Sequence, residues 1–163
     1  MKKALEVINE LKEKRLIDDY AIGGGISALF YIETILTYDL DIFIILPKEK
    51  RKEGLILLSP VFKYLEEKGY LWAGEHIVIE SIPVQFIPSD ELEEEAVKNA
   101  KEIEYEKVKT KVLTPEYLIA ILLRVGRKKD IEKIEKLLRQ TEIDKEKLTD
   151  ILQKRGLTEK FKF

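Results

Sequence analysis

The chain has 163 residues, of which 37% are charged, and its 29 Lys and Arg against 31 Asp and Glu give a formal net charge of −2 at pH 7. This length suits one domain with a sizeable core, and the balanced charge gives no general attraction to nucleic acids. The sequence has no Cys and a single His, His76, which excludes structural zinc clusters and cysteine nucleophiles.

Composition also indicates the compartment. No apolar run approaches the about 20 residues that a membrane span requires, and charges interrupt the N-terminus where a signal sequence would be apolar. We therefore expect a cytoplasmic protein, and the lack of Cys fits a reducing environment. The abundance of Lys, Glu and Ile resembles that of heat-adapted proteins.

The first half of the chain alternates between helix and strand patterns. Residues 2–15 have the apolar spacing of an amphipathic helix. Residues 20–22 predict a short buried strand that runs into Gly23-Gly24-Gly25, and an apolar helix is expected from Ile26 to about Leu36. Residues 39–46 predict a central strand, followed by a charged turn from Pro47 to Glu53.

The second half predicts further strands and then helices. Ser59-Pro60 should cap a helix that stops at Gly69. The later elements are strands at 70–72, 75–80 and 83–87, a helix from Ser89 to Ala100, and either a hairpin from 103–106 and 109–113 or one longer strand. Three C-terminal helices follow, the first opened by Thr114-Pro115, the second by Asp130 and the last holding Leu148, Ile151 and Leu152. With no linker or internal repeat, residues 1–163 form one domain, with a core of about 1–113 and C-terminal helices over about 114–163.

Two neighbouring features carry the chemistry. Glycines at the start of a helix let backbone N–H groups approach an anion, and the Ser27 hydroxyl could donate to a phosphate oxygen. Asp39 and Asp41 are two apart on a strand, so they share a face with Cα atoms about 6.6 Å apart and can converge on a divalent cation. Separately, the glycines could make a plain turn and the acids lie on a solvated face, but their order along the chain favours a nucleotide site.

This order resembles that of minimal nucleotidyltransferases of the DNA polymerase β superfamily, particularly the small prokaryotic branch found as toxins or in toxin–antitoxin pairs. That branch has an apolar strand, a Gly-Gly turn, a helix, and a Thr before Asp-x-Asp, matched here by Gly24, Gly25, Thr37, Asp39 and Asp41. The resemblance extends to the helix after Thr114 and the turn at 127–131. It implies that Gly24 and Gly25 hold a nucleoside triphosphate such as ATP, with Thr37 beside it, and that Asp39 and Asp41 ligate Mg²⁺.

The sequence departs from that pattern at three places. The family expects a third carboxylate as proton acceptor, but Gln85 stands at the matching position and cannot act as a base at neutral pH. Glu75 or Glu80 could supply the acid if the strand register differs. Ile35 replaces a polar residue, and residues 121–123 are apolar where relatives commonly have a lysine.

Other candidates have plainer interpretations. The cations of two turns could contact phosphate groups or be solvated; they are Lys48, Lys50, Arg51 and Lys52 in the first turn, and Arg127, Lys128 and Lys129 in the second. Trp72 could stack on a base, but we expect it in the core, and we interpret His76 as an ordinary strand residue.

The sequence thus predicts an α/β protein with a mixed, mostly antiparallel sheet of four to six strands, flanked by helices and closed by a C-terminal helical cap. We expect an enzyme that transfers a nucleoside monophosphate from NTP and Mg²⁺ to a hydroxyl on protein, RNA or a small molecule. The alternative is a catalytically impaired nucleotide-binding protein on the same scaffold, a toxin–antitoxin partner for example, because Gln85 replaces the acid.

Overall fold

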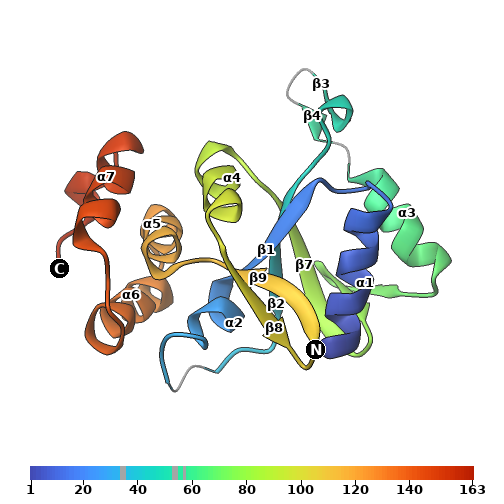
Figure 1. The fold of residues 1–163 in the computed structure, drawn as a ribbon, viewed down its shortest axis with the longest axis horizontal. Helices are drawn as coiled ribbons and strands as arrows, with labels where there is room; N and C mark the ends of the chain where they lie inside the picture. Colours follow the sequence, from blue (N-terminus) through green and yellow to red (C-terminus); the bar gives the residue numbers. More distant parts are fainter. Residues whose placement is uncertain (34–35, 53–54, 57) are drawn as a thin grey trace.

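A mixed sheet of seven strands forms the centre of the computed structural model, which describes residues 1–33, 36–52, 55–56 and 58–163 (Figure 1). In spatial order the strands are β5 (Leu71–Ala73), β6 (His76–Ile79), β7 (Ile82–Pro88), β2 (Leu40–Ile45), β1 (Asp19–Gly23), β9 (Val108–Val112) and β8 (Lys101–Tyr105). The helices are α1 (Lys2–Glu13), α2 (Gly24–Ala28), α3 (Ser59–Glu67), α4 (Glu91–Lys98), α5 (Pro115–Val125), α6 (Lys128–Gln140) and α7 (Lys145–Lys154). Short 3₁₀ turns, η1 (Lys48–Lys50) and η2 (Thr158–Lys160), and a small ribbon of β3 (Arg51–Lys52) with β4 (Leu55–Ile56) complete the described chain.

The pairing confirms a mixed, mostly antiparallel sheet. Strand β2 runs antiparallel to β1 and parallel to β7, and β1 runs parallel to β9; the other pairs are antiparallel. The sheet has seven strands instead of the expected four to six, because two hairpins, β5–β6 and β8–β9, extend it at opposite edges. Pro83 lies in β7, which is an inner strand and not an edge.

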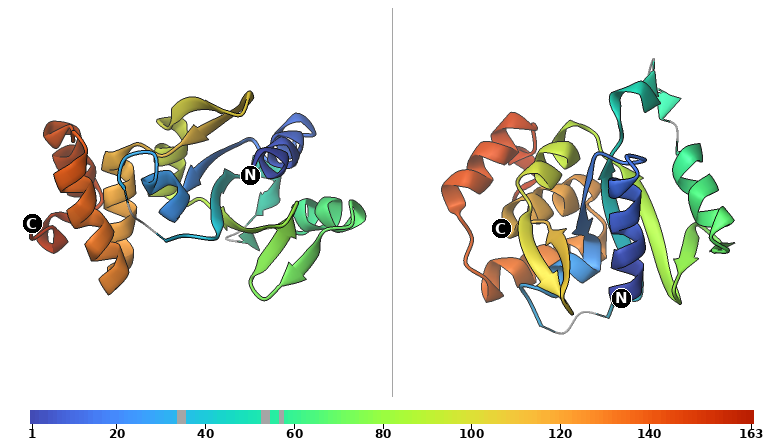
Figure 2. Two further views of the ribbon diagram at one scale, coloured as in Figure 1. Left: turned by 90° about the horizontal axis from the view of Figure 1, so that it is seen from below. Right: turned by 45° about the vertical axis from the view of Figure 1, so that its right-hand side comes forward.

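Alternate residues of the central strands face two separate cores. Ile42 and Ile44 belong to a cluster with α1 and α3, whereas Phe43 and Ile45 pack with α4 and α5 on the other side. The right-hand view of Figure 2 shows the two groups of helices on opposite sides of the sheet, with α6 and α7 outside α5. This period-2 division assigns odd-numbered positions of β2, including Asp41, to the side of the C-terminal helices.

Several predicted helix boundaries were wrong. The helix after the glycines ends at Ala28 instead of near Leu36, because turn-type bonds from Phe30 to Ser27 and from Tyr31 to Ala28 replace the helical pattern. Ser59 is the first residue of α3 and not its cap, and Asp90 caps α4 in place of Ser89. Thr114-Pro115 opens α5, as predicted, and Gly126 follows the helix in the left-handed conformation.

Charge pairs order the helices on the C-terminal side. Glu93 is buried, completes the capping box of α4 and accepts a hydrogen bond from Arg124 of α5. Arg155 and Lys154 of α7 pair with Glu95 of α4. Burial raises the pKa of Glu93, which shows that its contacts with Arg124 and the Asp90 backbone only partly offset desolvation.

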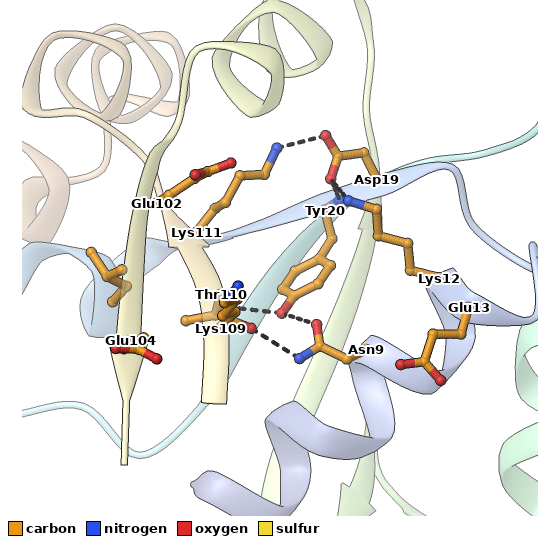
Figure 3. Close-up of a pocket in the computed structure, with 11 residues that line it drawn as sticks. Asn9, Lys12, Glu13, Asp19, Tyr20, Glu102, Glu104, Lys109, Thr110 and Lys111 are labelled. Atoms are coloured by element: carbon orange, nitrogen blue, oxygen red, sulfur yellow. Dashed lines mark hydrogen bonds and ion pairs between the residues drawn. The ribbon is translucent and has the colours of Figure 1, made fainter. Parts of the chain in front are cut away.

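A groove of about 930 Å³ separates α1 and β1 from the β8–β9 hairpin (Figure 3). Strands β1 and β9 are backbone-paired only near Ile22 and Val112, so the groove opens where they diverge. Side chains bridge it: the Tyr20 hydroxyl donates to Asn9 Oδ1 at 2.7 Å and lies 2.9 Å from Thr110 Oγ1, and Asn9 Nδ2 donates to Lys109 O. Asp19 pairs with Lys12 and Lys111 above them.

We predict that Tyr20→Phe lowers the free energy of unfolding by about 1–2 kcal/mol, because Asn9 and Thr110 lose a buried partner. Urea denaturation measures the loss. Tyr105→Phe is the matched control, since that hydroxyl has no hydrogen bond in the described part of the chain, and it should cost much less. Equal losses for both variants would contradict a bridging role for Tyr20.

Candidate functional site

The glycine corner, which consists of Gly23, Gly24 and Gly25, is in direct contact with Asp41. Gly23 and Asp41 are paired across β1 and β2. Gly24 follows with φ +58°, and a Cβ atom there would overlap Asp41 Oδ2. Glycine is therefore required at position 24 both for its backbone conformation and for space. The glycines at the start of α2 and Asp41 are therefore neighbours in space as well as in the order of the chain.

Thr37 packs against the second glycine. A Cβ atom on Gly25 would lie 2.6 Å from Thr37 Oγ1, closer than real side-chain contacts allow. Gly25 itself is buried, so the hydroxyl of Thr37 rests directly on the backbone. The chain before β2 thus folds back over the start of α2, and it brings Thr37, Asp39 and Asp41 to the same corner.

His76 joins this group, contrary to our interpretation of it as an ordinary strand residue. Its Nε2 lies 3.4 Å from Asp39 Oδ2, with 24% of the His76 side chain and 50% of the Asp39 side chain exposed. In the sheet, β7 separates β6 from β2, so the contact spans two strand spacings. Only the order β6-β7-β2 could reveal it, because 36 positions of sequence separate the residues.

The strand register fixes Gln85 beside Asp41. The two residues are partners in the parallel pair β2–β7. Glu75 lies in the turn before β6, and Glu80 lies in the turn before β7, where it accepts a hydrogen bond from the Tyr70 hydroxyl. Neither of these acids takes the place opposite Asp41, so the position of the expected third carboxylate holds an amide.

Asp41 carries an electrostatic cost. Burial raises its pKa above the ordinary carboxyl value, and the negative charge of Asp39 raises it further; Lys133, His76 and Arg127 act in the opposite direction. Lys133, a half-buried residue of α6 that the sequence analysis did not single out, has its pKa lowered mainly by burial, and the nearby Lys129 and Arg127 contribute to the lowering. Cations of the helical cap therefore act on the acidic pair.

The turn before α6 is built around Asp130. This residue is fully buried and accepts bonds from Arg127 through the backbone N–H, Nε and Nη2. The predicted cap role of Asp130 was wrong, because Arg127 occupies the cap position and Asp130 is the third helical residue. Lys128 and Lys129 are exposed in the first turn of α6, whereas the Arg127 guanidinium is held by Asp130.

The remaining candidates lie elsewhere. Ser27 is fully buried with its Oγ 3.4 Å from Leu113 O, so it faces the core. Trp72, predicted in the core, is 44% exposed on the edge strand β5, where it packs on Phe62 and donates to Glu66. Arg51 binds Glu94 and Leu46 O, and residues 121–123 are buried in α5. Ile35 and the end of the turn at Glu53 lie outside the described residues, as does the side chain of Lys52.

The acids can contribute to a cation site but do not complete one. Within residues 1–33, 36–52, 55–56 and 58–163, no three His, Asp or Glu side chains converge in a way that could hold a metal ion. Asp41 has a raised pKa from desolvation, which a cation would relieve, and the negative charge of Asp39 acts on it. Ligand oxygens from a second molecule would have to complete the coordination. The groove of Figure 3, at the other end of β1, does not include Asp39 or Asp41.

Comparisons with known proteins identify the fold. A crystal structure of an antigenic nucleotidyltransferase-like protein from Paracoccidioides brasiliensis is similar over 96% of this chain and 89% of its own, with a TM-score of 0.54 and 15% identity. The crystal structure of ANT(2″)-Ia in complex with adenylyl-2″-tobramycin is similar over 96% and 95%, with a TM-score of 0.51 and 16% identity. The chain has a nucleotidyltransferase-like fold.

Sequence comparison adds no assignment. No protein-family model matches the chain, and no curated protein matches it. At these identities the structural likeness establishes the fold, while activity depends on the site. Membership of the toxin–antitoxin branch stays a prediction. Among the described residues, no helix is both long and apolar enough to cross a membrane.

We predict that Gly24→Ala destabilises the protein more than Gly74→Ala. Both glycines have positive φ, so each variant incurs about 1–2 kcal/mol of backbone strain. Only Gly24 faces an obstacle, because its new methyl group would meet Asp41, whereas nothing lies within 4 Å at Gly74. Urea denaturation of the two variants compares the losses, and equal losses would contradict the contact between the corner and Asp41.

We also predict that Asp41→Asn stabilises the metal-free protein at pH 7. The folded pKa of Asp41 is raised, so ionising this residue costs folding free energy at pH values above the raised pKa and costs nothing below the ordinary carboxyl pKa of about 3.9. Thermal unfolding should show a Tm higher by roughly 2–4 °C at pH 7, equivalent to about 1 kcal/mol. The difference should vanish near pH 3, and a lower Tm at pH 7 would contradict the cost.

Proposed function

We propose that this protein binds a nucleoside triphosphate with Mg²⁺ and transfers the nucleoside monophosphate to an acceptor. The observation that supports the proposal most strongly is the contact between Gly24 and Asp41, because it brings a side-chain-free stretch of backbone against a half-buried carboxylate. A triphosphate lying on the glycines would reach a cation held by the acids. The fold found in the comparisons is consistent with this activity.

Gly24 and Gly25 are the proposed support for the triphosphate. Helix α2 has only five residues, so its dipole is small, and backbone N–H groups that a ligand can approach closely at glycine would supply most of the attraction. The Thr37 hydroxyl, which rests on Gly25, could donate to the same phosphate groups. Ser27 does not enter this proposal, since its hydroxyl faces Leu113 O.

Asp39 and Asp41 are the proposed Mg²⁺ ligands, as their oxygen chemistry and shared face suit a hard cation. When bound, Mg²⁺ would neutralise charge on the α-phosphate and the leaving pyrophosphate. Asp41 must be ionised to bind, so binding should weaken as pH falls through its raised pKa. The charges of Lys133 and Arg127 favour the ionised form of Asp41, which is the form that binds a cation.

A second candidate function rests on Gln85. Because this amide cannot accept the proton of an attacking hydroxyl, the chain could bind NTP and Mg²⁺ without turnover, as a regulatory or toxin–antitoxin partner on the same scaffold. The acidic pair argues against complete loss of chemistry, since retaining a buried carboxylate at a cost in stability has no structural benefit in the described contacts.

The test is to incubate the protein with each α-labelled NTP and Mg²⁺, with RNA or a copurifying protein present. We expect label transfer with at least one nucleotide, and a loss of about 100-fold or more in Asp41→Asn, because removing a metal ligand removes charge stabilisation in the transition state. Asp150→Asn, an exposed residue of α7, is the matched control and should keep full activity.

Binding without transfer would favour the second candidate function. It would appear as Mg²⁺-dependent NTP binding that Asp41→Asn abolishes, measured by calorimetry, with no labelled product. If neither NTP nor Mg²⁺ bound, both candidate functions would fail.

A further inference from the structure

The site lacks a proton acceptor where an alcohol would need one. An alcohol attacking phosphorus must lose its proton, and for comparison the pKa of bulk water is about 15.7. Gln85 is fixed beside Asp41 by the β2–β7 register and cannot take a proton. Asp39 and Asp41 are assigned to Mg²⁺, and His76 Nε2 is directed at Asp39. The described residues therefore leave no free base at the position opposite Asp41.

Positive charge from the first turns of α6 acts on Asp41. Lys133 and Arg127 act on Asp41 from α6, and Lys129 lies close enough to affect Lys133. Arg127 is bound to Asp130, which neutralises it locally, but Lys133 is half-buried and Lys129 is exposed. Once Mg²⁺ and the triphosphate occupy the acids and glycines, these two ammonium groups remain available for a second anionic ligand.

We propose that the acceptor is a phosphate monoester and not an alcohol. The proposal rests on the nucleotidyl transfer proposed above and specifies its second substrate. A phosphate monoester has a second pKa near 6, so it is mostly a dianion at pH 7.5 and attacks without losing a proton. Gln85 can donate its amide N–H to such an oxyanion, whereas a carboxylate at position 85 would repel it.

The reaction balances without a base. An oxygen of the acceptor phosphate attacks the α-phosphorus of the NTP, and a new P–O bond forms as the bond to the β-phosphate oxygen breaks. The products are a diphosphate that joins the acceptor to the nucleoside monophosphate, and pyrophosphate, which carries away the electron pair of the broken bond. No oxidant, reductant or further reactant is required.

The experiment offers matched acceptors to the full chain with MgATP labelled at the α-phosphate. The first pair is ribose 5-phosphate and ribose, and the second is an RNA oligonucleotide with a 5′-phosphate and the same oligonucleotide with a 5′-hydroxyl. Comparing the two pairs distinguishes a small-molecule acceptor from an RNA acceptor. Inorganic phosphate is the smallest probe and would give ADP. We expect transfer only to the phosphorylated members, with a diphosphate bridge in the ³¹P NMR spectrum of the product.

The variant Gln85→Glu tests the same point from the protein side. Restoring a carboxylate should raise the ratio of alcohol to phosphate transfer by about 100-fold or more, the usual contribution of a positioned base. The Asp41→Asn variant with MgATP reports separately on the proposed function, since it should lose nucleotide binding whichever acceptor is used.

A binding measurement without Mg²⁺ gives a readout independent of turnover. Calorimetry should detect ribose 5-phosphate but not ribose, and Lys133→Ala should weaken binding about tenfold through loss of a charge-assisted contact. Lys145→Ala, at an exposed position of α7, is the control and should bind normally.

Three outcomes would overturn the inference. The first is transfer to ribose or 5′-hydroxyl RNA at a rate equal to or above that of the phosphorylated partner. The second is bound MgATP with no transfer to any phosphate probe, including inorganic phosphate. The third is no binding of MgATP at all, which would overturn the proposed function as well. Measuring MgATP binding by calorimetry distinguishes this outcome from the second.

Discussion

The contact between Gly24 and Asp41 is the constraint on which the candidate site depends. The antiparallel register of β1 and β2 places Gly23 opposite Asp41. The chain therefore turns into α2 directly beside the Asp41 carboxylate. A side chain at position 24 would occupy the same volume as Asp41 Oδ2. The geometry of the glycine corner and the position of Asp41 therefore depend on each other, because a side chain at position 24 would displace the carboxylate.

This contact has an energetic consequence. Asp41 is desolvated and close to Asp39, so its ionised form is disfavoured in the folded chain, and no hydrogen bond or ion pair of the described residues offsets this directly. The positive charges of Lys133 and Arg127 in the helical cap partly offset this cost by lowering the pKa of Asp41. A chain that retains such an acid at a cost in stability is better explained by ligand binding than by folding, since neutral residues pack without that cost.

The helical cap brings positive charge to the acids in a chain with little net charge. Lys129 and Lys133 lie on one helix near the acids, while Arg127 is committed to the buried Asp130. Opposite charges thus meet across a small space instead of forming a surface of one sign. Gln85 has a place in this arrangement as a neutral donor between the acids and an incoming anion, which gives it a role beyond that of a missing base.

Local patterns in the sequence were sufficient for the glycine turn, the strand that contains Asp41, and the place of Gln85 beside that strand. These depend on spacing over a few residues, and the backbone geometry of a strand or turn converts spacing directly into placement. The burial of Glu93 and the inward direction of Ser27 were not predictable, because each depends on a partner far along the chain, Arg124 for Glu93 and Leu113 for Ser27.

The sequence by itself therefore determined the chemistry that residues 23–41 can offer and the class of fold. Only the tertiary structure decided that β7 pairs in parallel with β2 so that Gln85 adjoins Asp41, that His76 reaches Asp39, and that the charge of Lys133 acts on Asp41. Such contacts join segments separated by tens of residues. Packing of the whole sheet and cap selects them, and no local propensity or periodicity encodes that selection.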